Sequence, residues 1–177
     1  MAECKQAVLV EKETAHRDCL TGCYDRMTIR HLVDLCFLKS DVRQSHAMFV
    51  IDVDNFKDYN DKYGHANGDL CLKHFAATMK KCFPKDSILG RYGGDEFVVY
   101  IKNAVSDDAH RYMDEFQREI SHLMMSGGEH VTVSASAGGV AFIGEGEDFV
   151  SLCRSADNML YDVKRNGKGT FKMKGAK

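Results

Sequence analysis

The sequence predicts an α/β fold of the α+β kind, in which helices wrap around a central, mixed and mostly antiparallel sheet. Three observations lead to this prediction. Segments with helical apolar spacing alternate with short apolar runs that are typical of strands. Two of these runs flank Gly93-Gly94, a pair that favours a tight hairpin because glycine accepts positive φ at little cost. The other strand-like runs are separated by long helical segments, which serve as crossover connections in a layered fold.

The first half of the chain predicts a helix, a strand and two further helices. Apolar residues recur at helical spacing in residues 25–39. A continuous apolar run at residues 47–51 indicates a buried strand. Residues 56–63 predict a short helix closed by Gly64, and residues 66–83 predict a helix with one apolar stripe.

The second half continues with the hairpin, two long helices and two strands. A helix capped by Ser106 or Asp107 places apolar residues on one face as far as Met124, and Gly127-Gly128 ends it. Apolar and hydroxyl residues alternate in residues 131–137, which indicates a strand with one buried face. The expected elements are strands 88–92 and 97–101, helix 106–124, strand 131–137, helix 148–165 and an edge strand at 170–173.

Composition narrows the classes of function. The 177 residues suit one domain, and with 44% of them apolar the chain can bury a real core. With 24 basic and 26 acidic residues, the chain lacks the basic excess of a general nucleic-acid binder. Its seven cysteines form no CxxC pair, so we expect reduced thiols in a cytosolic protein. No apolar stretch predicts a membrane segment or a signal peptide.

Two acidic features point to chemistry. Asp52-Val53-Asp54 follows the buried strand 47–51, and alternate residues of a strand point the same way. Two carboxylates on one face favour a cation, and oxygen ligands suit Mg²⁺, although a solvated strand end is the simpler alternative. The second feature is the hairpin tip Gly93-Gly94-Asp95-Glu96, for which the alternative is an ordinary acidic turn.

The segment from Arg91 to Phe97 resembles the signature of the GGDEF family of diguanylate cyclases. Four further motifs occur in the family's order, so that the resemblance covers residues 18–169. Asp18, Leu20, Thr21 and Arg26 resemble DxLTxxxNR; Asp52 to Asp69 resembles DxDxFKxxNDxxGHxxGD; Ser136 to Gly138 resembles SxG; and Ala156, Asp157, Leu160, Tyr161 and Lys164 resemble ADxxLYxAK.

The resemblance implies a fold similar to the palm of adenylate cyclases and polymerases, with a ferredoxin-like core. It also implies that residues 18–174 form a catalytic domain, that residues 1–17 are a helical linker from an upstream sensor, and that 175–177 are a tail. The implied activity is condensation of two GTP into cyclic di-GMP and two pyrophosphates, dependent on Mg²⁺ or Mn²⁺. The implied partner is a second copy in a transient homodimer, within a cytosolic part of a larger membrane or soluble sensor protein.

The resemblance assigns a metal site to the strand end and the hairpin tip. Asp52 and Asp95 would bind Mg²⁺ from adjacent strands, and the Val53 carbonyl would complete the protein ligands. Glu96 would lie beside the metals and help activate the attacking hydroxyl. Asp95 and Glu96 are therefore the implied catalytic acids.

The resemblance also assigns a phosphate site. The backbone N–H groups of Asn55 and Phe56 would cradle phosphate at the start of a helix. Lys57, Lys164 and Lys168 would neutralise the triphosphate, and Lys57 would also take part in catalysis. The last two lysines are four residues apart, so they would share a face if the final helix persists far enough.

Three further residues would contact the substrate. Asn60 and Asp69 would recognise guanine, because an amide pairs with the O6 and N7 region and a carboxylate accepts from N1–H and the exocyclic amine. Adenine has no N1–H, so Asp69 would reject ATP. Arg91, at the start of the signature, is the remaining implied substrate contact.

Some positions depart from the family pattern. Asp25, Val163, Lys168 and Gly169 stand where Asn, Ala, Arg and Asn are frequent. The RxxD motif that many members use to bind product has no counterpart.

Pro84 and Ser87 occupy the positions of that motif, and Asp86 is one place off. We therefore expect no product inhibition through this surface.

Two alternatives to the enzyme stay open. A GGDEF domain that senses GTP without turnover is the main one, and a scaffold that only dimerises is the other. The presence of Asp52, Asp95 and Glu96 favours the enzyme, because degenerate members usually lose the signature acids.

Overall fold

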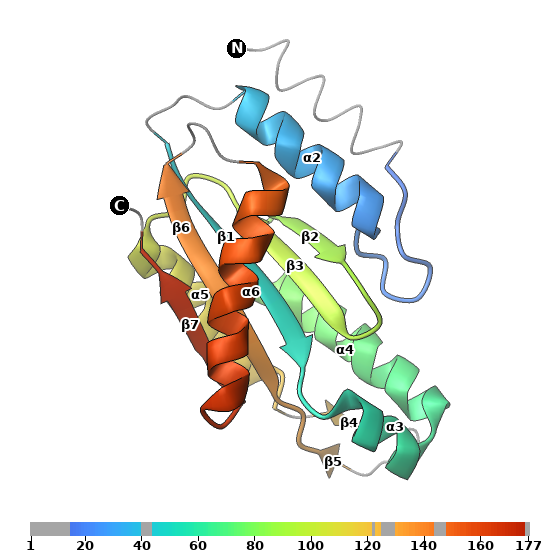
Figure 1. Cartoon of the computed structure of the whole chain (residues 1–177). Helices are drawn as coiled ribbons and strands as arrows, with labels where there is room; N and C mark the ends of the chain where they lie inside the picture. The colour runs from blue at the N-terminus through green and yellow to red at the C-terminus, as the bar shows by residue number, and fades with distance from the viewer. Residues whose placement is uncertain (1–14, 40–43, 122, 125–129, 144–147, 176–177) are drawn as a thin grey trace.

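The computed structural model describes residues 15–39, 44–121, 123–124, 130–143 and 148–175, and it confirms the predicted fold class. A five-stranded sheet forms the centre (Figure 1). Its strands are, in spatial order, β2 (Ile88–Arg91), β3 (Glu96–Ile101), β1 (Ser45–Val53), β6 (Ala135–Ile143) and β7 (Phe171–Lys174). The helices are α2 (Arg26–Lys39), α3 (Phe56–Tyr63), α4 (His65–Cys82), α5 (Ser106–Glu119) and α6 (Phe149–Arg165). Two short strands, β4 (Leu123–Met124) and β5 (His130–Val131), pair separately.

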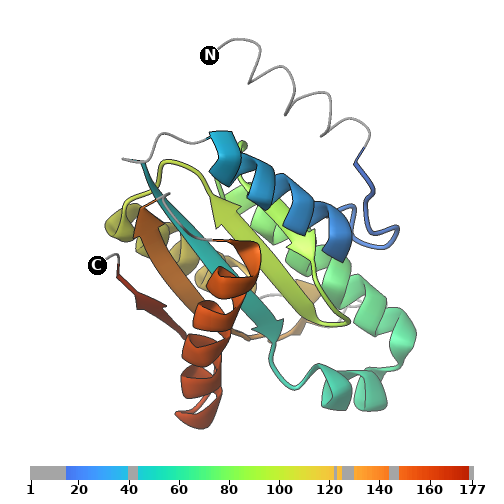
Figure 2. The ribbon, with the colours of Figure 1, turned by 45° about the horizontal axis from the view of Figure 1, so that its top comes forward.

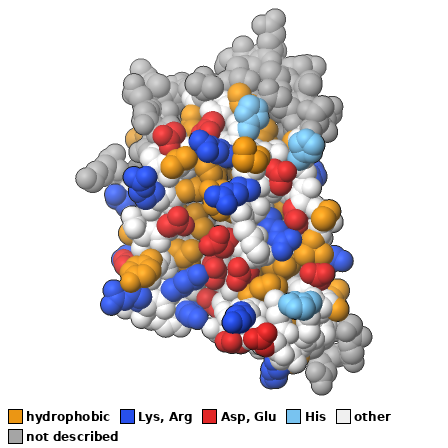
Figure 3. All heavy atoms as spheres, turned by 45° about the vertical axis from the view of Figure 1, so that its right-hand side comes forward, with side chains coloured by type: hydrophobic (Ala, Val, Ile, Leu, Met, Phe, Trp, Pro, Cys, Tyr) orange, Lys and Arg blue, Asp and Glu red, His pale blue; other side chains and the backbone are white. Residues whose placement is uncertain are grey.

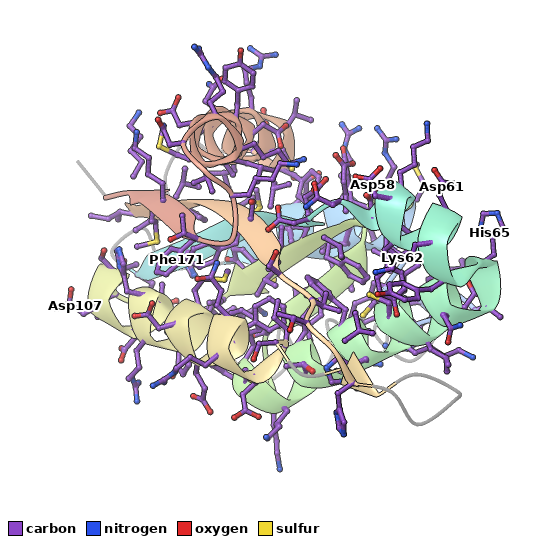
Figure 4. All side chains as sticks on the ribbon, turned by 90° about the horizontal axis from the view of Figure 1, so that it is seen from below. Asp58, Asp61, Lys62, His65, Asp107 and Phe171 are labelled. Carbon is purple, nitrogen blue, oxygen red and sulfur yellow. The ribbon has the colours of Figure 1, made fainter. Side chains whose placement is uncertain are left out.

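Helices cover both faces of the sheet. Figure 2 shows α2 and α6 on the near face, and Figure 4 shows α4 and α5 on the opposite side of the sheet from α6. All pairs in the sheet are antiparallel except β6 with β7. The central strand β1 sends Met48 and Val50 into the core under α2 and α6, and Phe49 and Ile51 into the core under α4 and α5. Burial on both faces explains why its sequence is a continuous apolar run.

Local signals placed several elements correctly. The hairpin of β2 and β3 lies around Gly93-Gly94, as predicted. The Asp25 carboxylate accepts a hydrogen bond from the Thr28 N–H at 2.8 Å at the start of α2. Asp148 and Ser151 form a capping box at the start of α6. Side-chain caps of this kind satisfy the unpaired N–H groups of a first turn.

The predicted helix 106–124 was too long. α5 ends at Glu119, and Leu123–Met124 forms strand β4, which pairs with β5. The Ser121 hydroxyl donates to the Arg118 carbonyl at 2.8 Å, a bond by which serine competes with helix propagation. Val105, not Ser106 or Asp107, is the N-cap. The predicted stop at residues 127–128 lies outside the described residues.

The predicted strand 131–137 is divided in the structure. It covers only the end of β5 and the start of β6, and β6 continues to Ile143 along the whole of β1. Ser134 stands before the ladder, where its carbonyl accepts from the Asp54 N–H at 2.9 Å. The strand runs through Gly138 and Gly139, which weaken strand propensity and therefore hid the extension from sequence analysis.

The two ends of the chain are only partly described. Of the predicted linker 1–17, residues 1–14 lie outside the described residues, as do residues 176–177 of the predicted tail. Arg17 forms an isolated antiparallel bridge with Tyr24. Within the described part of the chain, no helix has the length and apolarity needed to cross a membrane.

The edge strand β7 closes the core beside α5. Figure 4 shows Phe171 between the sheet and α5. The Phe171 ring lies 5.4 Å from the His110 ring of α5 and 6.2 Å from the Phe49 ring of β1, between ring centroids. The edge strand was predicted at residues 170–173, and the structure shows in addition that it contributes directly to the α4/α5 core.

Gly138 lets α6 approach the sheet closely. A Cβ atom at this position would lie 2.0 Å from the Ala156 carbonyl oxygen and 2.3 Å from the Leu160 nitrogen. Both atoms belong to the backbone of α6, which cannot move away as a side-chain tip can. The close packing of α6 therefore explains why glycine occupies this position of the SxG motif.

Gly138→Ala is expected to lower the free energy of unfolding by ~3 kcal/mol or more, the upper end for over-packed cores, because the clash is with backbone. Urea unfolding followed by circular dichroism measures this loss. Gly175→Ala is the matched control, since a Cβ there meets nothing within 4 Å. Equal effects of the two substitutions would contradict the close approach of α6.

His46 is a buried polar residue at the other end of β1. It is 1% exposed, its ring stacks on Tyr100, and its Nδ1 lies 3.2 Å from the Tyr100 hydroxyl. Burial lowers the pKa of His46, and the nearby charge of Lys102 lowers it further. A histidine in the unfolded chain titrates near ~6.5, so acid favours the unfolded state.

The free energy of unfolding should therefore fall as pH decreases through ~6.5, where the unfolded chain binds a proton that folded His46 does not. His46→Phe should weaken this pH dependence. Urea titrations between neutral and mildly acidic pH measure it. His65→Phe is the control, because His65 is exposed and projects outward at the start of α4 (Figure 4). An unchanged pH slope in His46→Phe would contradict the prediction.

Candidate functional site

The candidate site lies at the sheet edge where β1 ends and where β3 and β6 begin. Antiparallel pairing brings these three ends together (Figure 1). Asp52 of β1 stands opposite Glu96 of β3 on one side and Ser136 of β6 on the other. The two acidic features of the sequence, the strand end and the hairpin tip, therefore meet as predicted.

Asp52 is a buried carboxylate with one cationic partner. The residue is 9% exposed, and its Oδ2 lies 2.8 Å from the Lys164 Nζ in the last turn of α6. Burial raises the pKa of Asp52, and the nearby charges of Asp95 and Asp54 act in the same direction, while Lys164 acts against them. The lysine supplies the positive charge that this buried carboxylate requires.

Glu96 stands in a strongly acidic environment. Burial is the largest cause that raises the pKa of Glu96, and repulsion from Asp52, Asp157 and Asp95 raises it further. The Val53 N–H donates to the Asp95 carbonyl at 3.2 Å, which ties the hairpin tip to β1. Figure 3 shows acidic side chains gathered on one face of the molecule, with Lys and Arg side chains around them.

Asp157 belongs to the motif that resembles ADxxLYxAK, and the sequence predicted no role for it in the site. Its position on α6, close enough to affect the pKa of Glu96, comes from the packing of α6 on the sheet. No local sequence signal distinguishes it from an ordinary exposed helix residue.

The acidic groups suit a hard divalent cation that is shared with a ligand. Within the described residues, no three His, Cys, Asp or Glu side chains converge into a ready-made metal site. The predicted set of Asp52, Val53, Asp95 and Glu96 is therefore not preassembled, but it offers only oxygen donors. Mg²⁺ is commonly bound by one or two carboxylates together with substrate phosphates, and these residues fit that arrangement.

The turn between β1 and α3 forms the predicted phosphate side. Asn55 is the N-cap of α3 with a left-handed φ of 54°, and its side chain caps no N–H group. Instead, its Oδ1 accepts from the Lys168 Nζ at 2.7 Å. A helix start without a side-chain cap can donate its N–H groups to an anion. Phe56 and Lys57 form its first turn, and Lys57 is exposed.

Lys164 and Lys168 reach the site from different structural elements. α6 ends at Arg165, so Lys164 and Lys168 do not share a helix face. Lys168 lies in a turn with a φ of 62°, between Gly167 and Gly169, which also have positive φ. The helix ends at Arg165, as predicted, and the condition for a shared face is not met because these glycines favour a turn. The two ammonium groups nevertheless contact Asp52 and Asn55.

Arg91 is engaged within the protein. Its guanidinium donates to both Asp18 carboxylate oxygens, at 3.1 and 3.2 Å, and to the Gly94 carbonyl, at 3.1 and 2.7 Å. Although burial opposes it, hydrogen bonds from Thr21 and Arg91 lower the pKa of Asp18. Arg91 therefore joins the entry motif to the hairpin tip, a role that sequence analysis did not predict for this proposed substrate contact.

Asn60 and Asp69 lie on two consecutive helices joined at Gly64. The Asn60 side chain packs against Gly68, where a Cβ would lie 1.8 Å from the Asn60 Oδ1. This buried oxygen has no hydrogen-bond partner among the described residues, while Asp69 is exposed at the start of α4. An unpaired buried amide oxygen is costly unless a ligand satisfies it.

Comparison with known proteins supports the resemblance. The family model described as diguanylate cyclase, GGDEF domain, matches residues 15–170. Diguanylate cyclase DgcM of Escherichia coli K12 is 30% identical over 158 residues, which cover 89% of this chain and 38% of DgcM. The chain thus spans little more than a third of that relative.

Solved structures agree in fold. The GGDEF domain of TpbB (YfiN) from Pseudomonas aeruginosa superimposes with a TM-score of 0.84 and 28% identity, covering 89% of this chain and 94% of that one. The GGDEF domain of DgcB from Caulobacter crescentus, solved in complex with c-di-GMP, gives a TM-score of 0.81 and 25% identity, with coverages of 89% and 92%. The family model and the fold cover nearly the same residues, and the chain belongs to the GGDEF domain family.

Proposed function

We propose that this domain is a diguanylate cyclase, which condenses two GTP molecules into cyclic di-GMP and releases two pyrophosphates. The observation that carries the proposal is the pairing of Asp52 with Glu96 across β1 and β3, immediately before the α3 turn at Asn55. This arrangement places acidic groups beside a helix start that suits a phosphate.

The proposed chemistry is attack of a GTP 3′-hydroxyl on the α-phosphate of a second GTP. Asp52 and Asp95, with the Val53 carbonyl, would hold Mg²⁺ or Mn²⁺, and this cation would lower the pKa of the hydroxyl and stabilise phosphate charge. Glu96 would accept the hydroxyl proton, because a raised pKa makes a carboxylate a better base near neutral pH.

The lysines and the α3 turn would bind the triphosphate. Lys164 and Lys168 lie at Asp52 and Asn55, so positive charge flanks the turn on both sides. Lys57 adds an exposed positive charge in the first turn of α3, next to the Asn55 and Phe56 N–H groups. These groups would position the phosphates and offset their charge.

Product formation requires a second copy. Each domain would hold one GTP, and two phosphodiester bonds must form, so two sites would meet with two-fold symmetry. Positioning of the two substrates would then dominate the rate, which makes dimer geometry a point of control for an upstream sensor.

The first test is incubation of the domain with GTP and Mg²⁺, with mass spectrometry of the product. The domain is fused to a parallel coiled coil that enforces dimerisation. We expect cyclic di-GMP from the wild type and a loss of at least ~100-fold in rate for Asp95→Asn, because a charge at the reacting phosphates is removed. Asp107→Asn is the control, since Asp107 lies on α5, at the other end of the molecule from α3 in Figure 4.

GTP binding without product in the enforced dimer would contradict the enzyme and support the GTP-sensing alternative. If the enforced dimer neither bound GTP nor formed product, only the scaffold alternative would remain.

Base recognition is tested by comparing GTP with inosine triphosphate, which lacks the exocyclic amine. The Asp69 carboxylate should favour GTP by roughly 10- to 100-fold in kcat/KM, the range for one hydrogen bond to a charged group. Asp69→Asn should reduce this preference strongly, while Asp61→Asn, on the outer side of α3 in Figure 4, should keep it. A preference that survives Asp69→Asn would place guanine recognition elsewhere.

A further inference from the structure

Asp54 is a buried carboxylate to which the proposed function gives no role. It is 9% exposed, and three donors surround its two oxygens. Its Oδ1 accepts from the Ser136 hydroxyl at 2.6 Å, and its Oδ2 accepts from the Ser134 hydroxyl and the Gly169 N–H, both at 2.9 Å. The two acids of the strand end therefore differ, because Asp52 contacts a lysine and Asp54 contacts neutral donors.

These bonds connect the two turns that carry the phosphate-binding groups. Asp54 directly precedes Asn55 in the β1–α3 turn, and Gly169 directly follows Lys168 in the α6–β7 turn. The Lys168 Nζ reaches back to the Asn55 Oδ1 at 2.7 Å, parallel to the bond between Gly169 and Asp54. The Ser136 hydroxyl is a second contact for the Gly169 N–H, at 3.2 Å.

The backbone of the α6–β7 turn requires such support. Lys168 has a φ of 62°, in the left-handed region that side chains other than glycine and asparagine rarely occupy. Surrounding contacts must maintain a conformation of this kind. Hydrogen bonds to a buried carboxylate are among the stronger ones available in a protein, so Asp54 is suited to this task.

We propose that Asp54 is a positioning residue, which holds the α6–β7 turn so that Lys168 is presented to the triphosphate of GTP beside the α3 turn. The inference rests on the proposed function, because that function assigns Lys168 to phosphate. Asp54 acts through Gly169 and Lys168 and contacts neither the nucleotide nor a metal. Ser134 and Ser136 share this role as donors to Asp54.

A double-mutant cycle on GTP affinity tests the proposal. Asp54→Asn replaces one carboxylate oxygen by an NH₂ group and leaves an amide oxygen, a weaker acceptor, so the three bonds cannot all keep their strength. Asp54→Asn and Lys168→Ala should each raise the Kd for GTP roughly tenfold, the effect of one charge-assisted contact. The double variant should be no weaker than Lys168→Ala alone, because both changes remove the same contribution. In the enforced dimer, KM should rise in the same way while kcat changes little.

Additive losses in the double variant, or a fall in kcat without a change in Kd or KM, would overturn the proposal. Asp162→Asn is the control, because Asp162 pairs with Lys172 outside the site and the change in charge is identical. If Asp54→Asn does not fold, Ser134→Ala takes its place in the double-mutant cycle. This substitution removes only one donor to Asp54, so the same non-additive pattern is expected with a smaller rise in Kd.

Limited trypsin digestion measures how accessible the α6–β7 turn is in the absence of nucleotide. Asp54→Asn should accelerate cleavage after Lys168 several-fold over the wild type, and Asp162→Asn should not, because only the former weakens the acceptor of the Gly169 N–H. Wild-type cleavage rates in Asp54→Asn would overturn the positioning role whether or not the domain makes cyclic di-GMP. Accelerated cleavage in a chain that binds no GTP would instead assign the failure to the proposed function.

Discussion

The positions of the acidic groups that the strands carry into the site depend on the register of β1 between β3 and β6. Antiparallel pairing sets Asp52 opposite Glu96 and Ser136. A slip of one residue would turn Asp52 and Asp54 into the α4/α5 core and move the apolar set of each face to the other. Because β1 is buried along both faces, the hydrophobic free energy of two cores opposes that slip. The apolar interior therefore determines where the carboxylates lie.

The approach of α6 to the sheet is the second constraint, and it brings the positive charges. Gly138 allows the α6 backbone to lie against β6, and the last turn of the helix then carries Lys164 to Asp52. The helix ends at once, and the following glycines turn the chain so that Lys168 reaches Asn55. Lysines and acceptors that are more than 100 residues apart in sequence meet because α6 packs closely on the sheet.

Sequence reasoning succeeded where the determinants are local. Gly93-Gly94 encodes its hairpin, and the caps at Asp25 and Asp148 mark helix starts within a few residues. It failed where the structure is determined by contacts between residues that are far apart in sequence. Nothing near Asp52 and Asp54 distinguishes these two acids, since the donors to Asp54 lie 80 or more residues away in sequence. The start of β6 also depends on distant contacts. So does the pairing of Arg91 with Asp18, because 73 residues separate these two.

The balance of charge in the site separates groups with a structural role from groups that need a ligand. Asp18 is paired with Arg91, and Asp54 is satisfied by neutral donors, so neither requires anything further. Asp52 contacts one lysine, and the pKa of Glu96 is raised first by burial and then by the acids around it. Acidic groups that served stability alone would be expected to carry enough partners to balance their charge, because clustered carboxylates in excess of cations destabilise a fold. We infer that this remaining negative charge is retained for a cation and its bound phosphates.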